Sequence, residues 1–153
     1  MRIGSGYDIH RLASGRKLML GGIEIPSPKG EEAHSDGDVL LHALIDALLG
    51  SEANGDIGSH FPPCDPEWKD ADSRKLLETV LKEYKHRLIN IDCTILLERP
   101  KLRPHIDAIR ASLAELLAMD PADISVKAKT AEGCLAEFGT GDAVAASVTL
   151  LAE

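Results

Sequence analysis

Residues 38–49 read Asp-Val-Leu-Leu-His-Ala-Leu-Ile-Asp-Ala-Leu-Leu and predict a helix that is apolar on almost every side. Three polar residues in this stretch, Asp38, His42 and Asp46, fall four positions apart and therefore share one face. A buried carboxylate or imidazole is unfavourable unless it is paired or binds a cation. The stretch therefore predicts either a self-satisfied Asp-His-Asp hydrogen-bonded stack or one half of a metal site.

The segment Tyr7-Asp8-Ile9-His10 supplies candidates for the other half of such a site. It follows a β-like run at residues 2–6, and side chains two apart in an extended strand point to the same side. Asp8, His10 and His42 form a mixed nitrogen and oxygen set, which is typical of a catalytic zinc with an open fourth position. An isolated Asp-x-His motif usually consists of surface residues and is weak evidence for a metal site. Only the two segments together favour a divalent metal.

A short glycine motif, Gly4-Ser5-Gly6, precedes these candidate ligands. It follows a β-like residue, as in dinucleotide-binding folds, but it lacks the third glycine and the helix opening that those folds require. We therefore expect a turn or a close-packing role for it.

Composition limits the class of protein. With 153 residues, of which 44% are hydrophobic and 3% aromatic, the chain predicts a single domain, 1–153, with an aliphatic core. Its apolar stretches are too short to span a membrane, and its three cysteines lie far apart without a Cys-x-x-Cys motif, so we expect a soluble, cytoplasmic protein with reduced thiols. The net charge of −8 disfavours nucleic acid and anionic membranes as partners. A phosphate ligand would need local positive charge, which metal ions can supply.

Periodicity and turn signals predict the remaining elements. In chain order these are a hairpin at 17–26 around Gly21-Gly22, a loop at 26–32, an irregular stretch at 50–68, a helix after Asp72, a strand at 88–97, a helix near Pro104, and strands at 125–130 and 143–151. This order predicts an α+β fold: a two-layer sandwich with a mixed four-stranded sheet, an early β-hairpin and three helices packed on one face.

Ordered motifs run through nearly the whole chain, at residues 6–10, 34–48, 55–58, 61–62, 71–74, 100–105 and 127–132. Their residues and order resemble the 2-C-methyl-D-erythritol 2,4-cyclodiphosphate synthases of the non-mevalonate isoprenoid pathway. The resemblance implies a cyclase acting on 4-diphosphocytidyl-2-C-methyl-D-erythritol 2-phosphate. The substrate's own 2-phosphate would attack the β-phosphorus of the diphosphate, release CMP and close the cyclic diphosphate.

The resemblance also implies cofactors. Asp8, His10 and His42 would hold one zinc ion per subunit, and Glu132 would hold Mg²⁺ or Mn²⁺ together with the substrate. A phosphate nucleophile is already anionic near neutral pH, so the reaction needs no general base. Positioning of two anions and neutralisation of charge around phosphorus would then be sufficient.

Other residues receive roles from the same resemblance. His34 and Thr130 are implied as catalytic residues. The implied substrate-binding residues are Ser35, Asp56, Gly58, Lys101, Leu102, Arg103, Ala128 and Thr130. Independently of the resemblance, Asp38 and Asp46 lie one turn from His42 and are candidates to orient its ring from behind, although a purely structural bond explains Asp46 equally well. The family assembles as a homotrimer whose sites lie at subunit interfaces.

Two departures from the family pattern limit what is carried over. Pro63 stands where relatives often have an acidic residue that contacts substrate hydroxyls, and Asp65 is a candidate replacement. Residues 138–142 read Phe-Gly-Thr-Gly-Asp and lack the arginine that lines a central cavity in relatives, so binding of an isoprenoid diphosphate there is not implied. Two alternative functions remain, another zinc-dependent phosphohydrolase and a non-catalytic metal-binding trimer.

Overall fold

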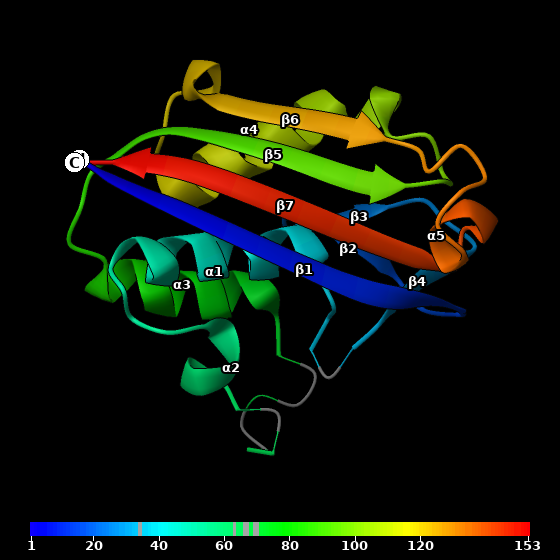
Figure 1. Cartoon of the computed structure of the whole chain (residues 1–153), viewed down its shortest axis with the longest axis horizontal. Coiled ribbons are helices and arrows are strands. Elements are labelled where there is room, and N and C mark those ends of the chain that lie inside the picture. Colours follow the sequence, from blue (N-terminus) through cyan, green and yellow to red (C-terminus); the bar gives the residue numbers. More distant parts are fainter. Residues whose placement is uncertain (34, 63, 66–67, 69–70) are drawn as a thin grey trace.

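A mixed five-stranded sheet, in the order β4-β1-β7-β5-β6, forms the centre of the computed structural model (Figure 1), which describes residues 1–33, 35–62, 64–65, 68 and 71–153. The strands are β1 (Arg2–Ser14), β4 (Lys29–Glu32), β5 (Leu88–Leu97), β6 (Ile124–Lys129) and β7 (Ala143–Ala152). Among these described strands only β5 and β6 pair in parallel, and α4 (Ile106–Leu117) supplies the crossover connection that a parallel pair requires.

The prediction of a four-stranded sheet is wrong. Residues 29–32, predicted within a loop, form the edge strand β4, which pairs antiparallel with residues 11–14 of β1. The sequence of β4 is Lys-Gly-Glu-Glu, so it lacks the apolar alternation by which a strand is recognised. The predicted hairpin is confirmed as a separate two-stranded sheet of β2 (Leu18–Leu20) and β3 (Ile23–Ile25).

The helices α1 (Val39–Ser51) and α4 cover one face of the sheet, and α3 (Ser73–Glu83) packs against both of them (Figure 1). The prediction placed three helices on one face of the sheet; α1 and α4 contact the sheet, whereas α3 packs mainly against these two helices. Two four-residue helices were not predicted, α2 (Ile57–His60) and α5 (Glu137–Thr140). Single 3-10 turns, η2 (Arg103–His105) and η3 (Pro121–Asp123), precede α4 and β6.

Helix α1 is the centre of the hydrophobic core. Its largest side chains are fully buried on all sides: Leu40, Leu41, Leu44, Ile45 and Leu48. It lies unusually close to β1, because a Cβ at Gly4 or Gly6 would come within 1.9 Å of a carbonyl oxygen of α1. The close-packing interpretation of Gly4-Ser5-Gly6 is therefore correct.

The opposite face of β1 carries exposed apolar side chains. Ile3, Tyr7 and Ile9 are 72%, 59% and 47% exposed, and they alternate with the residues that face α1. In Figure 1 the strands cross in front of α1 and α4, and the described helices leave this side of the sheet uncovered. None of the helices in the described ranges is long and apolar enough to cross a membrane.

Candidate metal centre

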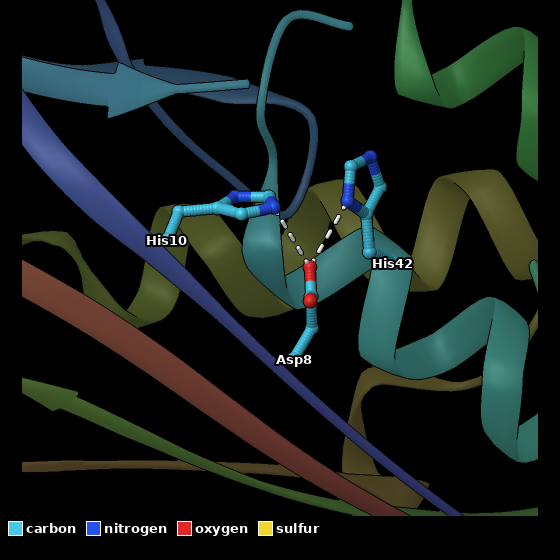
Figure 2. A group of neighbouring side chains, drawn as sticks. All are labelled: Asp8, His10 and His42. Carbon is cyan, nitrogen blue, oxygen red and sulfur yellow. Dashed lines mark hydrogen bonds and ion pairs between the residues drawn. The ribbon is translucent and has the colours of Figure 1, made fainter. Parts of the chain in front are cut away.

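Strand β1 and helix α1 bring the three predicted metal ligands together. Asp8 and His10 are alternate residues on the face of β1 that packs against α1, and His42 projects from α1 toward them (Figure 2). His10 Nε2 and His42 Nδ1 lie 3.2 and 3.0 Å from the same oxygen, Asp8 Oδ2. Ligand atoms bound tetrahedrally to zinc, with bonds of about 2.0 Å, are separated by roughly 3.3 Å. The cluster therefore has the composition and the close spacing of a possible metal site, with all three ligand atoms within 4.8 Å of one another.

The outer nitrogen of each imidazole is also held. His10 Nδ1 lies 2.8 Å from the carbonyl oxygen of Gly37, and His42 Nε2 lies 3.1 Å from Ser35 Oγ and 3.0 Å from Ser73 Oγ. A carbonyl oxygen only accepts, so His10 Nδ1 donates and Nε2 keeps its lone pair toward Asp8. Metal-binding histidines characteristically have such an outer partner, which fixes the ring.

Electrostatics favour the neutral, metal-competent form of the His10 imidazole. Burial of His10 lowers its pKa, and this effect exceeds the opposing influence of the Asp8 carboxylate. A histidine must be deprotonated to bind a cation, so a lowered pKa keeps the ring available at neutral pH.

The three ligands line a cavity of about 300 Å³. Its lining also includes the apolar side chains of Ile57, Phe61, Trp68 and Leu76, together with two predicted substrate-binding residues, Ser35 and Gly58. A third, Asp56, is exposed and caps α2 by accepting a hydrogen bond of 2.8 Å from the backbone N–H of Ser59. That bond is the main cause of the lowered pKa of Asp56.

The predicted stacking of Asp38, His42 and Asp46 is wrong. The helix begins at Val39, and the fully buried carboxylate of Asp38 accepts hydrogen bonds from the backbone N–H groups of Leu41, Gly21 and Gly22. It therefore caps α1 and anchors the turn of the β2–β3 hairpin.

The carboxylate of Asp46 accepts a hydrogen bond of 2.8 Å from the backbone N–H of Ile57. Of the two roles expected for Asp46, orientation of the His42 ring or a structural hydrogen bond, this contact is the structural bond. Ser73 contacts the outer nitrogen of His42, Nε2. The sequence analysis did not predict this partner, because a contact between residues 31 positions apart leaves no local sequence pattern.

The remaining predicted residues gather around a second cavity, of about 720 Å³. It lies between η2 and the end of β6. Its lining includes Lys101, Leu102, Arg103, Ala128, Thr130 and Glu132. The Thr130 hydroxyl donates a hydrogen bond to the Glu132 carboxylate. His34 and Pro63 lie outside the described residues.

The pairing of the strands shows how far apart the two cavities lie in the sheet. Asp8 pairs with Ala146, Ala146 with Ile95, and Ile95 with Ala128, so Asp8 and Ala128 lie in one transverse row of the sheet. Three inter-strand steps of about 4.8 Å place them roughly 14 Å apart. The described residues lining the two cavities do not overlap.

The whole chain, residues 1–153, matches the model of the YgbB family. The chain belongs to this family. Among its relatives, the 2-C-methyl-D-erythritol 2,4-cyclodiphosphate synthase of Treponema denticola is 53% identical over 99% of the chain and 95% of the relative. The enzyme of the same name from Halalkalibacterium halodurans is 50% identical over 99% of the chain and 98% of its own length.

Solved structures agree with this membership of the YgbB family. A 2C-methyl-D-erythritol-2,4-cyclodiphosphate synthase in a CDP-bound form superposes with a TM-score of 0.91 at 40% identity, over 99% of the chain and 100% of that structure. The CDP complex of IspF from Plasmodium falciparum superposes with a TM-score of 0.84 at 30% identity, over 99% of the chain and 94% of that structure.

Proposed function

We propose that the chain is a 2-C-methyl-D-erythritol 2,4-cyclodiphosphate synthase. The observation that carries this function is the convergence of Asp8, His10 and His42 on one cavity, in a chain that matches a synthase of that name over 95% of its length. The substrate's 2-phosphate oxygen forms a bond to the β-phosphorus, and the bond from that phosphorus to the oxygen bridging it to the α-phosphorus breaks. CMP leaves with the bridging oxygen.

The donor sets support two different metal ions. Asp8, His10 and His42 would hold zinc, and Glu132, an oxygen donor beside Thr130, would hold Mg²⁺ or Mn²⁺. These ions would neutralise charge on the diphosphate and fix its orientation. The nucleophile is already anionic, so none of the protein groups has to remove a proton from it.

We assign the second cavity to the nucleotide. Lys101, Arg103 and Lys129 line it, in a chain whose net charge is −8, so it supplies the local positive charge that a diphosphate needs. Leu102 and Ala128 would frame the base, and Thr130 and His34 would stabilise charge on the reacting phosphates. Ser35 and Gly58, which line the metal cavity, and Asp56, which caps α2 next to Gly58, would contact the diphosphate and the methylerythritol.

A site shared between subunits reconciles the two cavities. Ions held at the two cavities would both neutralise phosphates of one substrate, yet Asp8 and Ala128 of one chain are separated by three strand steps, roughly 14 Å. A closed homotrimer, in which the metal cavity of one subunit faces the second cavity of its neighbour, would join them. The uncovered sheet face with Ile3, Tyr7 and Ile9 is an apolar surface suited to the contact between subunits.

Residues 1–153 would form one domain, because the family model matches all of them. We also propose a cytoplasmic location, where the three cysteines, all free in the structure, would remain reduced.

The direct test is incubation with the cytidyl substrate and Mg²⁺, followed by phosphorus NMR. We expect CMP together with a product that has no terminal phosphate monoester. Inorganic phosphate or an open-chain product would instead indicate another zinc-dependent phosphohydrolase, and the absence of turnover would indicate a non-catalytic metal-binding protein.

The shared site is tested by mixing two inactive variants, His42→Ala in the metal cavity and Thr130→Arg in the second cavity. Every mixed trimer has one boundary at which both cavities are intact. Random equimolar mixing makes about three-quarters of the trimers mixed and should recover about a quarter of wild-type activity. Background activity, with mixed trimers verified by native mass spectrometry, would rule out sharing.

A further inference from the structure

Ser73 contacts the back of the His42 ring. It is the first residue of α3, its side chain is fully buried, and its Oγ lies 3.0 Å from His42 Nε2, the nitrogen on the side of the ring away from Asp8. The contact joins the start of α3 to the metal-facing side of α1. Because both ends lie in regular helices, the distance between them is set by the packing of the fold.

Asp36 holds Ser73 at two points. Its Oδ2 accepts a hydrogen bond of 3.1 Å from the Ser73 backbone N–H, and its Oδ1 accepts a second bond from the Ser73 hydroxyl. The backbone N–H of Asp36 donates in turn to the carbonyl oxygen of Ala71, at 3.0 Å. The side chain of Ser73 is therefore fixed in rotation, while the link between the Asp36 segment and α3 does not depend on the hydroxyl alone.

The directions of the hydrogen bonds follow from the chemistry of the three groups. An ionised carboxylate only accepts, so the single hydroxyl proton of Ser73 is directed to Asp36. The Ser73 oxygen then presents a lone pair to the ring, and His42 Nε2 must be the donor. Neutral imidazole carries one proton, so Nδ1 has its lone pair free on the side of Asp8 and His10.

We propose that Asp36 and Ser73 are positioning residues for the metal centre, which hold His42 as the Nε2–H tautomer with Nδ1 directed at the metal. The inference rests on the metal centre of the proposed function and is independent of the reaction carried out there. A hydrogen-bonded outer partner raises the basicity of a ligating imidazole and limits its rotation, and its loss typically weakens metal affinity by about 10- to 100-fold.

Ser35 is a weaker candidate for the same role. Its Oγ is 3.1 Å from His42 Nε2 and accepts a hydrogen bond from the Gly37 backbone N–H, but it lines the metal cavity, where the substrate would compete for it. Ser73 is fully buried. We therefore assign the permanent outer contact to Ser73.

The first measurement is zinc affinity, by competition with a chromophoric chelator and without substrate. Ser73→Ala should bind zinc about 10- to 100-fold more weakly than wild type. Ser51→Ala is the matched control, since it also removes a buried hydroxyl that makes two hydrogen bonds, to the Leu48 carbonyl and to Tyr84, away from the metal centre. Its zinc affinity should stay at the wild-type value.

The second measurement is nitrogen-15 NMR of the histidine rings in the zinc-loaded protein. In wild type the His42 proton should reside on Nε2 and exchange slowly with water. It should exchange faster in Ser73→Ala, and Ser73→Thr, which keeps the hydroxyl, should restore slow exchange. These signals report the contact itself and do not follow changes in global stability.

Several results would overturn the inference. One is wild-type zinc affinity in Ser73→Ala, and another is a His42 proton on Nδ1 in the zinc-loaded wild type, which decides the question even if the variant fails to fold. Failure of the wild-type protein to bind zinc would remove the metal centre as well. Normal CMP release by a zinc-loaded wild type, alongside an unaffected Ser73→Ala variant, would leave the proposed function standing and reject only the role of Ser73.

Discussion

Gly6 lies against the carbonyl oxygen of Ala43 so closely that a Cβ at residue 6 would be 1.9 Å from that oxygen. This contact sets the separation between β1 and α1 next to the metal centre. Asp8 follows Gly6 on the same face of β1, and His42 immediately precedes Ala43. The distance of 3.0 Å between Asp8 Oδ2 and His42 Nδ1 thus depends on the absence of a side chain at residue 6.

Replacing Gly6 with alanine should displace α1 and separate the metal ligands. A methyl group pressed against backbone cannot be relieved by rotation of a side chain, so we expect a loss of about 3 kcal/mol in unfolding free energy. Zinc affinity should fall at least about tenfold. Urea unfolding and chelator competition measure the two effects.

Gly50→Ala is the control for that substitution. Gly50 lies in α1 and also faces β1, but a Cβ there would be 3.8 Å from its nearest neighbour, the Ser5 carbonyl oxygen. We expect unchanged zinc affinity and a gain of up to about 1 kcal/mol from helix propensity. Equal behaviour of the two variants would contradict the role given to Gly6.

The two proposed metal sites should be separable by mutation. His42→Ala removes a nitrogen ligand and should abolish bound zinc. Glu132→Gln, on a different cavity, should retain zinc but lose activity and its response to Mg²⁺. Elemental analysis of the purified variants distinguishes them, and full zinc occupancy in His42→Ala would disprove the ligand assignment.

Cysteine reactivity provides a test of burial. Burial raises the pKa of the Cys93 thiol to about 12, whereas Cys64 and Cys134 are exposed. The thiolate is the reactive form, so a disulfide reagent at pH 8 should titrate Cys64 and Cys134 quickly in the native protein and Cys93 only after unfolding. Rapid modification of all three thiols in the native state would show that β5 is more accessible than the structure indicates.

Glu31 should make stability depend on pH. Burial, assisted by the nearby Asp38, raises the pKa of Glu31 well above 4.5. The folded state therefore holds this proton more tightly than the unfolded state, so the contribution of Glu31 is greatest below pH 4.5 and is lost as pH rises through its folded pKa. Burial of His10 lowers its pKa, which has the opposite sign, so stability from that source rises with pH up to about 6.5.

Glu31→Gln isolates the first of these effects. In metal-free protein, the unfolding free energy of wild type should fall relative to Glu31→Gln as pH is raised from 4.5. Urea denaturation at several pH values measures the difference. A difference that stays constant with pH would mean that Glu31 titrates alike in the folded and unfolded states.

Much of the metal centre could be predicted because periodicity indicates which side chains share a face. Asp8 and His10 obey the strand period, and the apolar surroundings of His42 indicate its burial. The same reasoning failed at Asp38, since a helical period says nothing about a residue that precedes the helix, and this residue caps the N-terminus of α1 instead. Ser73 and strand β4 were missed because their partners are distant in sequence and their own residues carry no apolar pattern.

The alternation of Gly4, Gly6, Asp8 and His10 along β1 has a consequence for how this chain tolerates insertions. All four residues face α1 because each step of two along a strand returns to the same side. One residue inserted between Gly6 and Asp8 would keep every amino acid of the motif and yet turn both ligands to the side where Ile9 now lies. Chain length within β1 is therefore as strictly constrained as residue identity, and single-residue deletions in this strand should inactivate the protein as fully as loss of a ligand.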